Sequence, residues 1–288
     1  MQTFTELSSL RKGLATWRER GATIAFVPTM GNLHAGHFSL IARARQLADH
    51  VVASVFVNPT QFGPNEDFDQ YPRTPDEDAA GLAKAGCDAL WLPSVDEMYP
   101  FGIEATVKVA VPGVTRLLDG AHRPGHFDGV ATVVSRLFNQ VQPDVAVFGR
   151  KDYQQLAVIR YMVTDMAFPV EIVGAPTFRA DDGLALSSRN QYLDAAQRAK
   201  APALYATLQT LARDVQDGRD IASAQAAGIA HLRSLGFEPD YLAVHDRTLG
   251  SANSNTDELV VLVAARLGKT RLIDNLEFSR FASSQNLQ

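Results

Sequence analysis

The chain of 288 residues is poor in cysteine and carries no excess of positive charge. Cys87 is its one cysteine, which excludes an internal disulfide and a thiolate-rich metal site and suits a reducing cytoplasm. Lysine and arginine number 27 against 32 acidic residues, a formal net charge of −5. Because a phosphate backbone favours a basic surface, this balance disfavours a nucleic-acid partner.

Long hydrophobic runs are also missing. The longest apolar stretches, near residues 51–57 and 259–265, have the length of strands and fall far short of the roughly 18 residues of a membrane span. The first residues lack the apolar stretch of a secretory signal. With 46% hydrophobic and 20% charged residues, the composition is typical of globular proteins, and we expect a cytoplasmic protein with no membrane partner.

The first part of the chain alternates short strand-like runs with amphipathic stretches. Runs at residues 23–28, 51–57, 88–93, 144–149 and 170–174 are rich in β-branched residues, and residues 128–141 have the spacing of an amphipathic helix. Thr74, Pro75 and Glu77 predict a helix start with a capping box. This alternation predicts an α/β fold, with a Rossmann-like parallel sheet covered by helices on both faces over residues 1–175.

The pattern changes beyond Pro176. Two alanine-rich stretches, near residues 194–216 and 221–235, predict helices, and three strand-like runs follow at 240–246, 258–267 and 270–278. The spacing of these runs is typical of an antiparallel meander. We therefore expect residues 176–288 to form a smaller α+β lid domain with an antiparallel sheet.

Ligands of open parallel sheets bind at the carboxyl ends of the strands, and the segment after the first predicted strand is rich in suitable residues. It reads PTMGNLHAGH over residues 28–37, and a helix is expected to start near His37. His34 and His37 are three residues apart, so both can face one anion site at a helix N-terminus and donate to phosphoryl oxygens. Ordinary loop and cap roles are the alternative, and a zinc site lacks further ligands nearby.

Three further polar segments follow predicted strands or precede a predicted helix. Their candidate residues are Asn58 and Gln61, then Lys151, Asp152 and Gln155, and finally Ser187, Ser188 and Arg189 between the two domains. The last group suits phosphate binding. Taken singly, each segment also has a local explanation, as turn, helix-start or N-cap residues.

The combination of these segments is more specific than its parts. A His-x-Gly-His turn after the first strand and a serine and arginine segment after the last resemble the class I nucleotidyltransferase pattern. Within that superfamily, the chain resembles the pantoate–β-alanine ligase family over about residues 27–275. The matching motifs are PTMGNLHAGH, FVNPTQF, YPRT, RPGHFDGV, FGRKDYQQ, GLALSSRNQYL and LVAARLGKTRLIDN.

The resemblance implies an ATP-dependent condensation of (R)-pantoate with β-alanine through a pantoyl-adenylate, with AMP and pyrophosphate released. It also implies Mg²⁺ with ATP, a homodimer, and His37, His34 and Lys151 as catalytic residues. The substrate residues would be Gln61, Gln155, Asn58 and Arg123. The ATP residues would be Met30, Gly31, Asn32, Leu33, His34, Ala35, Gly36, His37, Gly149, Arg150, Lys151, Asp152, Phe178, Leu186, Ser187, Ser188 and Arg189.

Several assignments keep an alternative. Arg123 and His126 are expected over the pocket or in a plain loop role. The acidic turn of Asp76, Glu77 and Asp78 is expected to cap a helix or to contact Mg²⁺ from outside, since the ion binds mostly phosphate oxygens and water. The chain departs from the family pattern by having Arg150 where glutamate is common and Thr60 where methionine is common.

Two other functions share parts of the pattern. A nucleotidyltransferase acting on a phosphorylated small molecule would have the same His-x-Gly-His turn, but Gln61 and Gln155 favour a non-phosphorylated hydroxy acid. A catalytically idle nucleotide-binding module would not need both histidines and Lys151. An aminoacyl-tRNA synthetase is disfavoured by the acidic charge and by the short length.

Overall fold

The computed structural model describes residues 1–64, 66 and 68–281. The chain divides into two compact units, and each is described by itself. Unit 1 comprises Met1–Arg150 and Gln154–Pro176, and unit 2 comprises Lys151–Tyr153 and Thr177–Gln288. The short segment Lys151–Tyr153 therefore groups with the second unit, although the sequence analysis expected it in the first domain.

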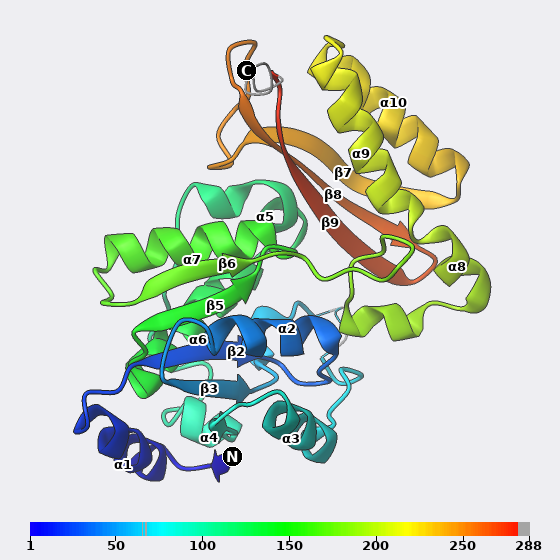
Figure 1. The fold of residues 1–288 in the computed structure, drawn as a ribbon. Helices are drawn as coiled ribbons and strands as arrows, with labels where there is room; N and C mark the ends of the chain where they lie inside the picture. The colour runs from blue at the N-terminus through cyan, green and yellow to red at the C-terminus, as the bar shows by residue number, and fades with distance from the viewer. Residues whose placement is uncertain (65, 67, 282–288) are drawn as a thin grey trace. The chain divides into compact units, whose positions relative to one another are not determined.

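Unit 1 is built on a six-stranded parallel sheet (Figure 1). Its order is β1-β4-β3-β2-β5-β6, and the prediction of an α/β fold with a parallel sheet is confirmed. The strands are β1 (Gln2–Phe4), β2 (Ile24–Thr29), β3 (His50–Val55), β4 (Ala89–Trp91), β5 (Val145–Gly149) and β6 (Glu171–Ala175). Strand β1 was not predicted, because three residues are too few for a periodic pattern.

Alternate residues of the strands enter two separate cores, one on each face of the sheet. Ile24 and Phe26 of β2 join the core beneath α1 (Leu7–Arg18), α4 (Val95–Met98), α6 (His126–Val141) and α7 (Tyr153–Asp165). Ala25 and Val27 join the core beneath α2 (Ala35–Ala44) and α3 (Pro75–Lys84). Since both faces of the central strands β2 and β3 are buried, these strands are mostly apolar rather than alternating.

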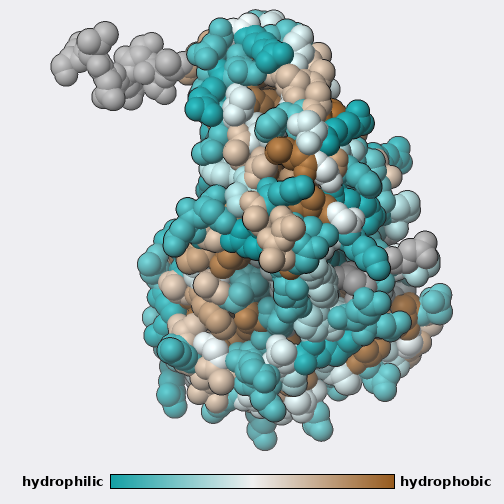
Figure 2. Space-filling view, turned by 90° about the vertical axis from the view of Figure 1, so that its right-hand side faces the viewer, coloured by the Kyte–Doolittle hydropathy of each residue, from teal (hydrophilic) through white to brown (hydrophobic). Residues whose placement is uncertain are grey.

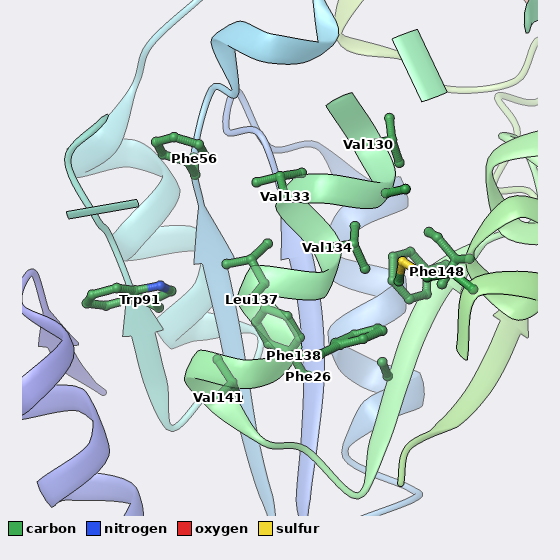
Figure 3. Close-up of a cluster of buried hydrophobic side chains, with 14 of the residues drawn as sticks. Phe26, Phe56, Trp91, Val130, Val133, Val134, Leu137, Phe138, Val141 and Phe148 are labelled. Carbon is green, nitrogen blue, oxygen red and sulfur yellow. The ribbon is translucent and has the colours of Figure 1, made fainter. Parts of the chain in front are cut away.

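Helix α6 is the largest contributor to the first core. Its apolar stripe, which includes Val130, Val134 and Phe138, packs against Phe26 and Phe148 of the sheet (Figure 3). This stripe is the i, i+3, i+4, i+7 pattern predicted from the sequence, and the helix extends two residues further toward its N-terminus. The short elements of this unit are η1 (Pro59–Gln61), η2 (Val114–Arg116) and α5 (Leu118–His122).

Both predicted helix starts are found, and their caps are now visible. Helix α2 begins at Ala35, near His37 as predicted, and His34 is its N-cap. Helix α3 begins at Pro75 as expected, but the predicted capping box is wrong, since Thr74 makes no side-chain cap hydrogen bond. Thr74 has ψ 58° instead of the extended backbone that a capping residue adopts.

Unit 2 contains a three-stranded antiparallel sheet, β7-β8-β9, and this confirms the predicted meander. Its elements are η3 (Ser188–Tyr192), α8 (Ala195–Lys200), α9 (Ala203–Gln216), α10 (Ile221–Ser234), β7 (Phe237–Asp246), β8 (Glu258–Leu267) and β9 (Thr270–Ser279). The helical stretch predicted near residues 194–216 is confirmed as two helices, α8 and α9, which are separated at Pro202, a residue that lacks an N–H. Strand β7 starts earlier than predicted and accommodates Pro239 at a register shift.

The face of the molecule in Figure 2 carries mostly hydrophilic side chains with small apolar patches between them. Within residues 1–64, 66 and 68–281, no helix is both long and apolar enough to span a membrane.

Candidate active site

The sheet of unit 1 has one topological switch point, between β2 and β5. From β2 the chain runs through β3 to β4 on one side, and β5 returns to the other side of β2. Ligands of such sheets bind outside the carboxyl ends of the two strands at this point. Residues 30–37, which the sequence singled out, follow β2, and Gly149 is the last residue of β5.

The turn after β2 is held in its shape by Asp78, which lies on α3. Both carboxylate oxygens accept backbone hydrogen bonds, from Asn32 N at 2.9 Å and from Leu33 N at 2.7 Å. Gly31 has φ +89°, and a Cβ at that position would lie 3.0 Å from the Asp78 carboxylate. The Asp78 carboxylate therefore binds the turn after β2, a role that the sequence did not predict.

His34 and His37 form a reciprocal cap at the start of α2. The Nδ1 atom of His34 accepts from Gly36 N at 3.1 Å, and the Nδ1 atom of His37 accepts from His34 N at 3.3 Å. The two ring centroids are 4.2 Å apart. A backbone N–H can only donate, so each neutral ring carries its proton on Nε2. The cap thus produces two Nε2–H donors at a helix N-terminus, where the helix dipole favours an anion.

Asn58 and Gln61 lie at the carboxyl end of β3, around η1. Both are buried, and Asn58 Nδ2 donates to Gln61 Oε1 at 3.1 Å. Gln61 Nε2 lies 2.9 Å from Met30 Sδ in the turn after β2. The structure therefore brings Gln61 next to the turn after β2, and Asn58 contacts the side-chain carbonyl oxygen of Gln61.

Arg123 and His126 support the backbone of Gln61. Arg123 makes a two-pronged ion pair with Glu66, at 2.7 Å for each oxygen, and its Nη1 lies 2.9 Å from His126 Nε2. Since a guanidinium only donates, His126 Nε2 accepts, and its Nδ1–H donates to the Gln61 carbonyl at 2.8 Å. The main contacts of the Arg123 guanidinium are thus within the protein.

Two pKa shifts follow from this cluster. Burial, and then the nearby Arg123 charge, lower the pKa of His126 to about 4, so the ring is neutral at neutral pH. Burial alone would raise the pKa of Glu66, but the hydrogen bonds and charge of Arg123 outweigh it and lower the value to about 2. The cluster is therefore an ion pair joined to a neutral imidazole.

Two adjacent glutamines after β5 have different environments. Gln154 is buried and bonds to the backbone of residues 114, 117 and 119, whereas Gln155 is only half-buried. Arg150 is exposed, and its Nε donates to the Gly174 carbonyl of β6 at 3.1 Å. The Arg150 side chain therefore lies along the edge strand.

In unit 2, the backbone of Lys151 is fixed by β9. Its carbonyl accepts from Asn275 Nδ2 at 2.9 Å, and its Nζ lies 3.9 Å from Asp152 Oδ1. Asp274, the neighbour of Asn275, is buried and accepts two hydrogen bonds from Arg179, at 2.6 and 2.9 Å. Removal of Arg179 would leave the Asp274 charge buried without a partner, so this ion pair is costly to break.

The segment from Phe178 to Arg189 forms a narrow turn in the same unit. Leu186 N donates to the Phe178 carbonyl at 2.9 Å, which places these two residues opposite each other. Ser187 caps η3 by accepting from Arg189 N at 3.3 Å, so the local N-cap explanation holds for this serine. Arg179, within the turn, also bonds the Asn275 carbonyl, so unit 2 brings this segment and Lys151 to the same stretch of β9.

Four residues that bond to candidate site residues or their neighbours were not assigned to the site from sequence: Asp78 and Tyr99 in unit 1, and Asp274 and Asn275 in unit 2. Asp274 and Asn275 are the last residues of the family motif at residues 262–275, and Asp78 belongs to the acidic turn at residues 76–78. The sequence therefore contained a signal for these three residues. Asp78 meets Asn32 across 46 residues, Tyr99 meets Asn58 across 41, Asp274 meets Arg179 across 95 and Asn275 meets Lys151 across 124. Only the fold shows these pairings.

Comparisons with known proteins agree on one family. The family model described as Pantoate-beta-alanine ligase matches residues 2–277. The pantothenate synthetase of Stenotrophomonas maltophilia (strain R551-3) is 58% identical over 278 residues, covering 96% of this chain and all of that protein. That of Xylella fastidiosa (strain 9a5c) is 57% identical over 280 residues, with the same coverage.

Solved structures agree with this match. The crystal structure of pantothenate synthetase from Thermus thermophilus has a TM-score of 0.91 and 49% identity, covering 98% of this chain and all of that one. Pantoate-beta-alanine ligase from Francisella tularensis, complexed with beta-gamma ATP and beta-alanine, has a TM-score of 0.82 and 33% identity, covering 97% and 98%. Between the ligase and the nucleotidyltransferase alternative, these matches decide for the ligase. The chain belongs to the pantoate-beta-alanine ligase family.

Proposed function

We propose that this pantoate–β-alanine ligase works in two chemical steps. A carboxylate is a poor acyl donor because its leaving group would be oxide. In the first step the pantoate carboxylate attacks the α-phosphorus of ATP, and pyrophosphate leaves. In the second step the amine of β-alanine attacks the pantoyl-adenylate carbonyl, AMP leaves, and the amine proton is released.

The single observation that carries the first step is the reciprocal cap of His34 and His37. The cap holds both imidazoles in the tautomer whose Nε2–H donates, at the N-terminus of α2 and at the switch point of the sheet. Donors fixed before the reaction stabilise negative charge that develops on phosphate oxygens. We assign this role to His34 and His37, with the residues from Met30 to Gly36 lining the nucleotide.

Unit 2 supplies the other cationic groups of the proposal. Lys151 and Arg189, with the hydroxyls of Ser187 and Ser188, bind the phosphates that become pyrophosphate. The backbone of Lys151 is tied to β9 through Asn275, so the start of its side chain does not have to be ordered when ATP binds. Phe178 and Leu186, which face each other across their turn, contact the nucleotide, as do Gly149 and Asp152.

Gln61 and Gln155 bind pantoate in this proposal. Amide groups hydrogen-bond its hydroxyl and carboxylate oxygens without adding a charge that would stabilise the ground state. Gln61 also lies near the β-alanine site, and Asn58 and Arg123 act mainly by holding Gln61 and its surroundings. The family resemblance and the hydrogen bonds of Gln61 support these roles.

Mg²⁺, a homodimer and a cytoplasmic location complete the proposal, on the family resemblance. No group of three or more His, Cys, Asp or Glu side chains in residues 1–64, 66 and 68–281 is arranged to hold a metal ion. In this proposal the ion enters with ATP, is held by phosphate oxygens and water, and contributes by neutralising phosphate charge. Light scattering of the purified protein tests the dimer.

Exchange of labelled pyrophosphate into ATP tests the two-step mechanism. We expect exchange with pantoate present and β-alanine absent, and AMP release only when all three substrates are present. His34→Ala and His37→Ala should each slow adenylation by about a hundredfold or more, the loss expected for a transition-state donor. His231→Ala, at an exposed histidine of α10, is the matched control. Exchange that strictly requires β-alanine, or wild-type rates in both variants, would contradict the proposal.

A further inference from the structure

A buried chain of hydrogen bonds lies behind Gln61 in unit 1. The Tyr99 hydroxyl, at the C-terminal end of α4, donates to Asn58 Oδ1 at 2.6 Å, and Asn58 Nδ2 donates to Gln61 Oε1 at 3.1 Å. Tyr99 and Asn58 are each 1% exposed. Thr60 adds its hydroxyl, 3.0 Å from Asn58 Oδ1 and 3.3 Å from the Tyr99 hydroxyl.

The orientation of the Asn58 amide in these hydrogen bonds is determined by two neighbouring groups, one that can only donate and one that can only accept. Thr60 N–H can only donate, and it lies 3.3 Å from Asn58 Oδ1. The Gly129 carbonyl can only accept, and it lies 3.2 Å from Asn58 Nδ2. An Asn58 amide turned over by 180° would place donor against donor and acceptor against acceptor, so its orientation is the one described.

The orientation of Asn58 determines that of Gln61. Because Asn58 presents an N–H to Gln61, the partner atom of Gln61 must be its carbonyl oxygen. The Gln61 amide group, Nε2, then faces the opposite way, toward Met30 of the nucleotide turn. Gln61 thus presents N–H donors, which match carboxylate and hydroxyl oxygens, and not a carbonyl.

Tyr99 is suited to maintain this arrangement. Burial raises the pKa of Tyr99, against smaller lowering effects of the Thr60 hydrogen bond and the Arg136 charge, so the hydroxyl keeps its proton at neutral pH. A protonated phenol bonded to Asn58 Oδ1 stabilises the same amide orientation that Thr60 N–H and Gly129 require. The Thr60 hydroxyl acts in the same direction, and it stands where the family commonly has methionine, which cannot donate.

We propose that Tyr99, assisted by the Thr60 hydroxyl, is a positioning residue for pantoate: it orients Asn58 and thereby holds Gln61 with its N–H donors toward the substrate. This inference rests on the proposed role of Gln61 in pantoate binding. Tyr99 contacts no substrate itself and acts through two amides. Its removal should therefore weaken the use of pantoate and leave the use of ATP nearly unchanged.

The test is Tyr99→Phe, which removes the hydroxyl and keeps the ring. We expect kcat/KM for pantoate to fall about tenfold, the scale of one buried hydrogen bond and a partly misoriented amide, with KM for ATP within twofold of wild type. Thr60→Val should give a smaller loss of the same kind, and the double variant more than the product of the two, because Asn58 Oδ1 then keeps only Thr60 N–H. Tyr161→Phe, at an exposed tyrosine of α7, is the control.

Thermal unfolding of each variant is measured in parallel to show that it is folded at the assay temperature. Unchanged constants for pantoate in Tyr99→Phe, or an equal loss for pantoate and ATP, would overturn the positioning role. A wild-type enzyme that releases no AMP with ATP, pantoate and β-alanine would contradict the proposed function instead, so the two failures are distinguishable.

Discussion

The substitution Asp78→Asn tests how the turn after β2 is held. Each Asp78 carboxylate oxygen accepts one backbone N–H of the turn, at 2.9 and 2.7 Å, and the side chain is buried. An asparagine keeps one acceptor and replaces the other by an NH₂ group, which faces an N–H donor. One hydrogen bond to a charged group is lost and one buried donor remains unpaired, a cost of about 2–3 kcal/mol.

Thermal unfolding measures this cost. For a chain of this size, 1 kcal/mol lowers Tm by roughly 2–4 °C, so the transition that reports unit 1 should fall by about 5–10 °C. We also expect KM for ATP to rise, because the turn carries His34 at its end. Asp76→Asn makes the same chemical change at an exposed position of the same helix and should leave both quantities near wild type. Equal Tm values for the two variants would refute the reasoning.

Three further outcomes are expected. Because the Arg150 side chain is exposed, Arg150→Glu should leave turnover within a few-fold and change ATP affinity by at most about 1 kcal/mol, with a smaller effect at high salt. A loss of ATP affinity that equals that of Lys151→Ala and persists at high salt would show a direct phosphate contact. Asn275→Ala should lower the rate of pyrophosphate exchange about tenfold, because the Lys151 carbonyl loses its hydrogen-bond partner. The control Asn255→Ala, in an exposed loop, should leave the rate unchanged. Equal exchange rates in the two folded variants would contradict this prediction. The pKa of His126 is about 4 in the folded protein, against an ordinary value of 6.5. Between these two pH values the unfolded chain binds a proton that the native state does not. The free energy of unfolding should therefore fall by up to about 1.4 kcal/mol per pH unit as the pH drops from 6.5 to 4. Urea unfolding across this range should show a weaker slope in His126→Asn, and an equal slope would contradict the assignment.

Much of the site follows from rules that act along the sequence. Apolar β-branched runs separated by an amphipathic helix indicate a parallel sheet, and the switch-point rule then places the residues after β2 and β5 at one edge. His34 and His37 belong to one short segment, so their spacing already relates them to the same helix end. For these residues, local pattern and general topology are sufficient.

Local pattern failed where a stronger or more distant interaction decided the structure. Thr74 has the residue type and spacing of a cap, but its backbone conformation does not allow the hydrogen bond. Helix α2 is capped by the imidazole side chains of His34 and His37, an unusual choice that propensity does not indicate.

The sequence by itself determined the class of fold and the polar segments that follow β2, β3 and β5, because each depends on neighbours in the chain. Only the tertiary structure decided what those segments touch. Asp78 meets Asn32 across 46 residues, and Tyr99 meets Asn58 across 41, because packed helices and strands bring them together. Which way the Gln61 amide faces depends on the one-way hydrogen-bonding groups around Asn58, and no pattern of residue types contains that information.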